Sequence, residues 1–204
     1  KLYTSDKWIL NRFNNVTAAV TENLEKFELG MAVSKLYDFI WDDFCDWYIE
    51  LAKIRMNGAD EESADSARRV LVWTMSNTLK LLHPFMPYIT EEIWQTLPHD
   101  GEALIVAKWP EYDEALSFPQ EAKNLENVMA LIRAIRTRRN EMNVPPSKKA
   151  HIYIDTAHPA PYEEASEFIA RLAYGSKVEI GTGFDVQGAV TAVTDDAKAL
   201  LPMD

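Results

Sequence analysis

Hydrophobic residues recur at three- and four-residue steps through most of the first 142 positions, which is the spacing of helices with one apolar face. The pattern predicts helices over residues 6–28, 31–56, 63–82, about 88–97 and 119–142. Gly30 separates the first two helices, and Asn57-Gly58 closes the second, because glycine readily adopts the left-handed conformation that ends a helix. Two prolines in "HPFMP" (83–87) interrupt the pattern before the short helix.

The spacing changes near the two prolines of "NVPPSKK" (143–149), which follow the last long helix. Beyond them "AHIYIDT" alternates like a strand, "PYEEASEFIARLAYG" is helical, and three more short strand-like runs follow. The pattern predicts a mainly α protein, with an antiparallel helical bundle over residues 1–147 and a small α+β subdomain over 148–204. The irregular segment 98–118 is expected to be an ordered crossing held by Trp109.

The second predicted helix distributes its apolar and polar side chains in an unusual way. At 100° per residue, its core face collects Leu36, Ile40, Phe44, Trp47, Leu51 and Ile54, flanked by Tyr37, Trp41 and Tyr48. Its opposite face is polar and carries Asp38, Asp42, Cys45, Asp46, Lys53 and Met56, with Ile49 at the centre. Either a neighbouring helix covers Ile49, or Ile49 packs against an unstacked RNA base. In the second case the nearby carboxylates accept hydrogen bonds from base amino groups.

Composition limits the classes of function that fit the chain. The formal net charge is −11, so any RNA contact must use base contacts or a local basic patch rather than general attraction to phosphates. A single cysteine, Cys45, excludes an internal disulfide bond and a cysteine-cluster zinc site. No apolar run approaches the ~18 residues of a membrane span, and the first residues do not resemble a signal peptide. We therefore expect a cytoplasmic protein with no membrane partner.

The basic residues gather in one segment, 133–149, which has six Lys or Arg against one Glu. Arg133, Arg136 and Arg139 are three residues apart and form one stripe of the last long helix. The stripe is either a solvated face near a helix C-terminus, where cations are favourable, or a ridge that contacts RNA phosphates.

No group in the sequence makes a convincing catalytic centre. There is no glycine-rich phosphate loop, and none of the four histidines has metal-ligating partners at helical spacing. Cys45 lies among aromatic residues without an evident histidine partner, which favours a structural thiol. The residues therefore predict a chain without catalytic activity of its own.

Four segments together resemble the anticodon-binding region of class Ia aminoacyl-tRNA synthetases. They are "DKWILNRFN" (6–14), "LYDFIWDDFCDWYIELAK" (36–53), "TLKLLHPFMPYITEEIWQTL" (78–97) and "RAIRTRRNEMNVPPSKK" (133–149). "FCDWYIELAK" and "RNEMNVPPSKK" together are most similar to bacterial valyl-tRNA synthetases, while isoleucyl and leucyl enzymes share the third segment and differ more elsewhere. The resemblance covers nearly the whole chain and is strongest over residues 6–149.

The resemblance implies a helical bundle that grips the anticodon stem-loop of tRNA-Val, followed by a small α+β appendage. In the family, a separate catalytic domain with HIGH-like and KMSKS-like signatures attaches valine to tRNA with ATP. Neither signature occurs here, so we expect a non-catalytic fragment with no cofactor of its own, and ATP bound by the parent's catalytic domain. The expected partners are tRNA-Val and the catalytic domain of the same polypeptide.

Carried over by position, Ile49 in "DWYIE" matches a family residue that approaches the anticodon bases. Asp42, Asp46, Glu50 and Lys53 are its neighbours and complete the expected tRNA-binding site on this helix. Two other interpretations stay open. One is the same module of an isoleucyl- or leucyl-tRNA synthetase, and the other is a helical module that binds proteins through its acidic surface and exposed aromatic residues.

Overall fold

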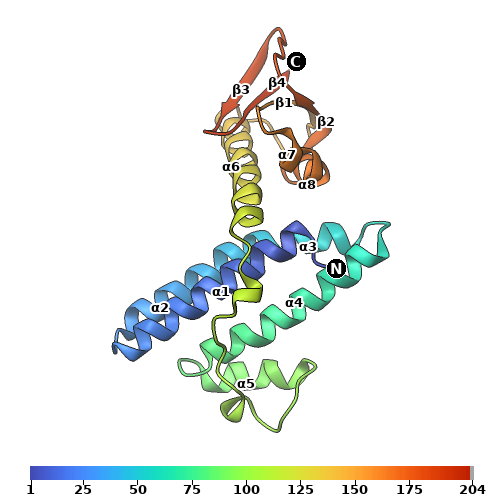
Figure 1. Ribbon diagram of the computed structural model, residues 1–204. Helices are drawn as coiled ribbons and strands as arrows, with labels where there is room; N and C mark the ends of the chain where they lie inside the picture. The colour runs from blue at the N-terminus through green and yellow to red at the C-terminus, as the bar shows by residue number, and fades with distance from the viewer. Residues whose placement is uncertain (203–204) are drawn as a thin grey trace. The chain divides into compact units, whose positions relative to one another are not determined.

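The computed structural model describes residues 1–202, and its internal contacts divide the chain into two compact units. The N-terminal unit is Lys1–Ala122, and the C-terminal unit begins at Lys123. Figure 1 shows long helices in the first unit, and in the second most of the long helix α6 with a small sheet and short helices. The chain is therefore mainly α with a small α+β part, as the sequence predicts.

Helices joined by short turns build the N-terminal unit (Figure 1). They are α1 (Thr4–Glu25), α2 (Leu29–Asp38), η1 (Phe39–Tyr48), α3 (Ile49–Met56), α4 (Glu61–Leu82) and α5 (Pro87–Thr96). We call the continuous run α2–η1–α3 the rod. Because α1, the rod and α4 run in alternating directions and contact one another, their apolar faces share one core. Phe27, predicted as the last apolar residue of the first helix, lies beyond its end at φ 58 and is 89% exposed.

The rod is uninterrupted, as predicted, but its middle part, η1, is a π-helix. The backbone N–H of Ile49 donates to the carbonyl of Phe44, five residues earlier. In an α-helix the same N–H would donate to the carbonyl four residues earlier. The buried positions accordingly step by five residues from Phe39 to Phe44. Ile40, predicted in the core, is only half-buried, and Tyr48, predicted at its edge, is fully buried. The prediction failed here because a wheel at 100° per residue assumes an α-helix throughout.

The core of the N-terminal unit consists of large apolar side chains from α1, the rod and α4. Its most completely buried members are Trp8 and Ile9 of α1, Leu36, Phe39, Tyr48 and Leu51 of the rod, and Leu81 of α4. Trp47 is also buried, with 7% of its surface exposed, whereas Ile49 keeps part of its surface in solvent. The predicted orientation of the rod is therefore confirmed at the two positions on which the expected RNA-binding face depends.

A buried ion pair joins α1 to the end of the rod. The guanidinium of Arg55 donates to both carboxylate oxygens of Asp6, with Nη1–Oδ1 at 2.5 Å and Nη2–Oδ2 at 3.0 Å. Tyr48 Oη and Ser66 Oγ also donate to this carboxylate, at 2.9 and 2.7 Å. Arg55 Nε donates to Ser63 Oγ of α4. This network satisfies two buried charges and thereby fixes the relative positions of three helices.

We expect a Tyr48→Phe variant to lose stability less steeply than the wild type above pH 10. Burial, followed by the charge of Asp6, raises the pKa of Tyr48 above its usual value of 10.0. Above that pH the unfolded chain releases the phenol proton while the folded chain keeps it, so unfolding becomes more favourable by about 1.4 kcal/mol per pH unit. Urea unfolding at several pH values above neutral measures the slope, and equal slopes for the two chains would contradict the assignment.

The segment after α5 crosses α1 and is held there by hydrogen bonds. Trp109 Nε1 donates to Thr21 Oγ1 at 3.0 Å, which confirms the anchoring role predicted for this tryptophan. The side-chain amide of Asn14 bonds both backbone groups of Asp113. Two short 3₁₀ turns lie in this segment, η2 (Leu104–Val106) and η3 (Glu114–Leu116). The buried side chain of Leu104 packs with Trp94 of α5, so the segment also covers the end of the helical bundle.

The C-terminal unit combines the greater part of one long helix with a four-stranded sheet. Its elements are α6 (Pro119–Glu141), which begins just before the division, β1 (Ala150–Asp155), α7 (Pro159–Glu164), α8 (Ser166–Leu172), β2 (Gly175–Gly181), β3 (Ala189–Val193) and β4 (Lys198–Pro202). The strand order is β2-β1-β4-β3, in which β1 and β2 are parallel and the other pairs antiparallel. A parallel pair requires a crossover connection, which α7 and α8 supply.

The division between the two units falls at Ala122, near the start of α6, whereas the sequence places a domain boundary after residue 147. The reason lies in contacts near the end of α6. The guanidinium groups of Arg136 and Arg139 both lie over the ring of Tyr174, which precedes β2. These contacts attach α6 to the α+β subdomain, although its helical pattern continues that of the bundle.

Candidate nucleic-acid interface

The outward face of the rod carries the five residues that the sequence and its family resemblance single out there. Asp42 and Asp46 belong to the π-helical part, and Ile49, Glu50 and Lys53 to α3. The two aspartates and the lysine are exposed, and Ile49 and Glu50 are half-buried. Ile49 and Glu50 lie within one turn of Lys53 on α3, and all five residues keep part of their surface in solvent. The neighbouring helices therefore leave Ile49 accessible, as an apolar contact surrounded by polar groups.

The aspartates of this face are available as hydrogen-bond acceptors. Within residues 1–202, neither Asp42 nor Asp46 has an ion pair or hydrogen bond through its carboxylate. Asp43 differs, because it accepts a bond from Arg12 Nε at 2.9 Å across to α1. Exposed carboxylates without partners suit the amino groups of unpaired bases, which donate hydrogen bonds from their edges. Lys53 pairs with Glu50 at 2.8 Å, and this exposed pair is weak enough to exchange partners.

The lone cysteine adjoins this face without adding reactivity to it. Cys45 is half-buried on η1. Burial, followed by the negative charge of Asp46, raises the pKa of its thiol above the usual value. Because the thiolate is the nucleophile, a raised pKa makes the group less reactive at neutral pH. The structural role predicted for this thiol agrees with its surroundings.

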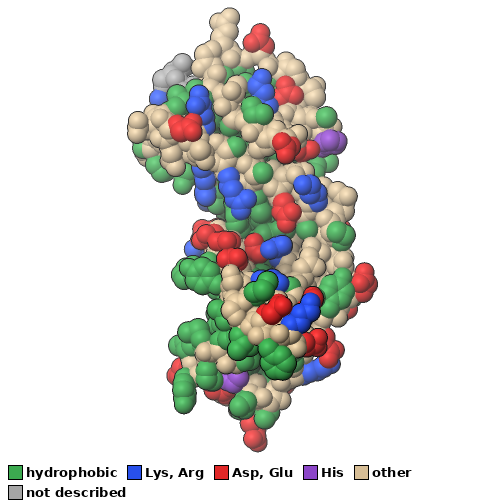
Figure 2. Space-filling view, turned by 90° about the vertical axis from the view of Figure 1, so that its left-hand side faces the viewer, with side chains coloured by type: hydrophobic (Ala, Val, Ile, Leu, Met, Phe, Trp, Pro, Cys, Tyr) green, Lys and Arg blue, Asp and Glu red, His purple; other side chains and the backbone are tan. Residues whose placement is uncertain are grey.

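Two aromatic rings on the same rod are more exposed than the sequence pattern indicates. Tyr37 is 61% exposed and Trp41 is 52% exposed, and their ring centroids lie 6.2 Å apart. Both were predicted at the edge of the core. Trp41 lies within the π-helical η1, where a wheel at 100° per residue fails, whereas Tyr37 lies on α2, before η1. In Figure 2, hydrophobic side chains form several exposed groups on the N-terminal unit, interspersed with acidic and basic ones. Exposed rings beside carboxylates extend the candidate interface, because unstacked bases pack on aromatic faces.

The arginine stripe of α6 does not form one solvent-facing ridge. Arg139 is 2% exposed, and its Nη2 donates to the carbonyl oxygens of Pro145 and Lys148. Arg136 is half-buried, and its Nε donates to the carbonyl of Leu172 at 2.6 Å. Only Arg133 of the three is exposed. The placement of Arg139 argues against a phosphate contact, because its guanidinium holds the turn after α6 and is closed off from solvent.

The described residues contain no group of three or more histidine, cysteine or acidic side chains that could hold a metal ion. No helix within residues 1–202 has the length and apolar character needed to cross a membrane. His83 follows α4, and its Nδ1 lies 2.8 Å from Thr90 Oγ1 of α5. This hydrogen bond stabilises the turn between the two helices. What the rod offers is thus a binding surface of carboxylates, one aliphatic side chain and aromatic rings.

Residues 6–154 match the family model described as the anticodon-binding domain of tRNA ligase. The match covers most of the chain, and the chain belongs to this family. Curated relatives agree over almost the full sequence. A valine–tRNA ligase of Bacillus licheniformis is 43% identical over 98% of the chain, and one of Staphylococcus aureus is 41% identical over all of it. A third, from Bacillus cereus, is 42% identical over 98% of the chain.

The chain spans only about a quarter of the length of these relatives, between 23% and 24%. It therefore corresponds to the part of a tRNA ligase that the family model describes, the anticodon-binding domain. The matched residues include all the helices of the N-terminal unit, α6 and β1, whereas the rest of the α+β subdomain lies beyond the match.

Proposed function

We propose that this chain recognises the anticodon stem-loop of tRNA-Val through the outward face of the rod, as part of a valine–tRNA ligase. The observation that carries the proposal is the half-buried Ile49, which stands between the unpartnered carboxylates of Asp42 and Asp46 and the exposed pair of Glu50 and Lys53. Ile49 supplies an apolar contact for an unstacked base, and the carboxylates accept hydrogen bonds from base edges. Base contacts of this kind suit a chain whose net charge is −11.

Attachment of valine to tRNA with ATP takes place in a catalytic domain of the same polypeptide, and the present chain contributes no catalytic group and binds no cofactor. Its location is the cytoplasm, where tRNA is charged. The relatives named as valine–tRNA ligases support this choice over an isoleucine or leucine enzyme.

Ile49→Ala is expected to lower discrimination between anticodons while leaving the fold nearly intact. The side chain is half-buried, so its truncation should cost about 1 kcal/mol or less. Leu51→Ala, at a fully buried position of the same helix, is the matched control and should cost about 2–5 kcal/mol. Thermal unfolding measures both, and a large drop for Ile49→Ala would assign Ile49 to the core.

Discrimination is measured as the ratio of dissociation constants for two hairpins, the anticodon stem-loop of tRNA-Val and the same hairpin with a permuted anticodon. We expect the wild-type chain to prefer the first hairpin and Ile49→Ala to prefer it less. An unchanged ratio in a folded variant would remove Ile49 from the interface.

Filter binding of purified tRNAs to the 204-residue chain tests the partner itself. Preferential, salt-sensitive retention of tRNA-Val over tRNA-Ile and tRNA-Leu is the expected result. Equal retention of all three would leave the family assignment in place and contradict the choice of tRNA. Preference for tRNA-Ile or tRNA-Leu would assign the module to the corresponding enzyme.

A further inference from the structure

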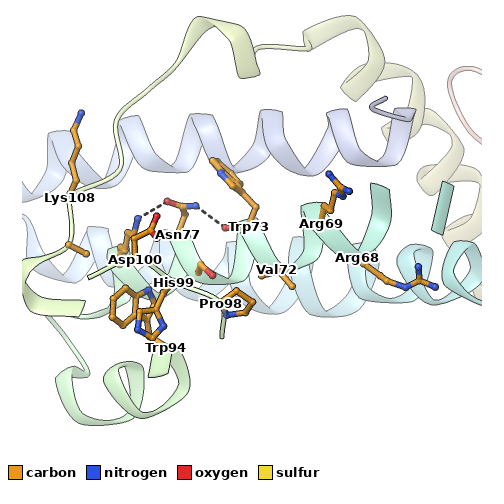
Figure 3. A pocket seen from close by; sticks show the side chains of 13 residues that line it. Arg68, Arg69, Val72, Trp73, Asn77, Trp94, Pro98, His99, Asp100 and Lys108 are labelled. Carbon is orange, nitrogen blue, oxygen red and sulfur yellow. Dashed lines mark hydrogen bonds between the residues drawn. The ribbon is translucent and has the colours of Figure 1, made fainter. Parts of the chain in front are cut away.

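A cavity of about 750 Å³ lies in the N-terminal unit, away from the outward face of the rod. Figure 3 shows its walls, which come from α4, from Trp94 of α5, and from the segment that follows α5. None of the five candidate residues of the rod lines it. Its size falls within the range of small-molecule sites in proteins. The cavity is therefore a separate place at which a ligand can be held.

The charged side chains around the cavity are mostly basic. Arg68, Arg69, Lys80 and Lys108 line it, against one acid, Asp100. This balance is opposite to that of the chain, whose net charge is −11. Three of the cations pair with carboxylates on the surface, but these pairs are exposed and an incoming anion can displace them at low cost. The charge around the cavity thus favours an anionic ligand.

Lys80 and Ser76 give the cavity two polar groups without adequate partners. The only polar contact of the Lys80 ammonium within residues 1–202 is Asn77 Oδ1, at the long distance of 3.4 Å. Ser76 Oγ is buried and has no hydrogen-bond partner among the described residues. Buried polar groups are normally satisfied, so the Ser76 hydroxyl calls for an explanation, and the half-buried Lys80 ammonium has no close protein acceptor. A ligand oxygen would give the Lys80 ammonium the close acceptor that it lacks, and the Ser76 hydroxyl would reach the same oxygen after rotation about its Cα–Cβ bond.

Aromatic rings complete the cavity. His99 stacks on Trp94 with ring centroids 3.8 Å apart and an angle of 27° between the planes. Trp73 lines the cavity from α4, is 40% exposed and is held by an edge contact with Phe13 at 5.3 Å. Figure 3 shows Trp73 on α4 and the Trp94–His99 pair together at another part of the lining. Stacked and partly exposed rings provide flat surfaces on which a planar ring can pack.

We infer that this cavity binds a nucleoside monophosphate unit, either as a free nucleotide or as one residue of a single-stranded RNA. Lys80, Ser76 and the basic side chains at the rim hold the phosphate, because cations and hydroxyl groups match its oxygens. The partly exposed rings of Trp73 and His99 pack against the base, and the buried Trp94 supports His99. The inference is independent of the tRNA specificity proposed for the rod, since it rests on other residues.

NMR titration of the ¹⁵N-labelled 204-residue chain tests the inference, with the indole N–H signals of Trp73 and Trp94 as reporters. Adenosine and uridine monophosphates, a single-stranded tetranucleotide, inorganic phosphate and an acidic peptide serve as probes. We expect saturable shifts of both indole signals with the nucleotides, and weaker binding of inorganic phosphate. Tighter binding of the tetranucleotide at the same signals identifies RNA as the source, whereas equal binding identifies the free nucleotide.

Lys80→Gln keeps most of the side-chain stem and should weaken nucleotide binding about tenfold or more. Lys80→Arg, which retains the cation, should restore much of the affinity. The matched control is Lys26→Gln, which removes one positive charge from an exposed lysine of the same unit that pairs with Glu22. Absence of nucleotide-induced indole shifts would overturn the inference. So would equal loss in the two glutamine variants, or equal binding of nucleotide, inorganic phosphate and acidic peptide.

Discussion

An Asp6→Ala variant is expected to lose about 3–5 kcal/mol of unfolding free energy, because it leaves the buried guanidinium of Arg55 without its carboxylate. Both side chains are almost fully buried, and both carboxylate oxygens of Asp6 accept bonds from Arg55. Tyr48 and Ser66 would lose an acceptor at the same time. The variant therefore removes several charge-assisted hydrogen bonds from one buried site, which makes its effect larger than that of a single contact.

Urea unfolding at neutral pH, followed by circular dichroism, measures this loss in the transition of the N-terminal unit. Glu22→Ala is the matched control, because it removes a carboxylate from the same helix that pairs with Lys26 at 2.5 Å on the surface. We expect the control to lower the stability far less, because exposed ion pairs contribute little. Equal losses in the two variants would show that the buried network is not a major source of stability.

Trp47→Ala should cost about 3–5 kcal/mol as a large-to-small change in the core. The indole is 7% exposed on the inner side of the rod, where the surrounding side chains would leave a cavity after truncation. Trp41→Ala provides the comparison, because this second tryptophan of the rod is 52% exposed and should cost less than about 1 kcal/mol. Thermal and urea unfolding measure both. Similar stability of Trp47→Ala and the wild type would contradict the orientation of the rod.

The extent of most helices follows from hydrophobic spacing alone. The last long helix is predicted over about 119–142 and observed as Pro119–Glu141. The strand-like run that begins with Ala150 forms β1, where the burial of side chains alternates as the sequence does. These elements were predictable because each buries one face, and burial of one face leaves a regular period in the sequence.

The π-helical part of the rod was not predictable by the same reasoning. A wider turn changes which residues point inward, and the sequence contains no glycine or proline in η1 that would signal it. The exposure of Trp41 was missed for this reason, whereas Tyr37 precedes η1 on regular α-helix and was placed too near the core by its spacing alone. The sequence left open whether Ile49 is covered or accessible, and the structure shows it half-buried, with part of its surface in solvent.

The arginine stripe shows a different limit of sequence reasoning. Spacing by three places Arg133, Arg136 and Arg139 on one side of α6, but it does not reveal what that side meets. The turn after α6 and the ring of Tyr174 enclose Arg139. Tyr174 is distant from Arg139 in the sequence, and the turn has no regular hydrophobic spacing from which its contact could be predicted. The cavity beside Trp94 could not be predicted from the sequence either. Its walls come from two helices and a crossing segment, which only the folded chain brings together.

The central claim is that the outward face of the rod meets the anticodon loop. Chemical-shift mapping of the ¹⁵N-labelled chain, titrated with the tRNA-Val anticodon stem-loop, tests it most directly. We predict the largest changes at Asp42, Asp46, Ile49, Glu50 and Lys53. Saturable changes confined to other surfaces, with these five signals unmoved, would contradict it.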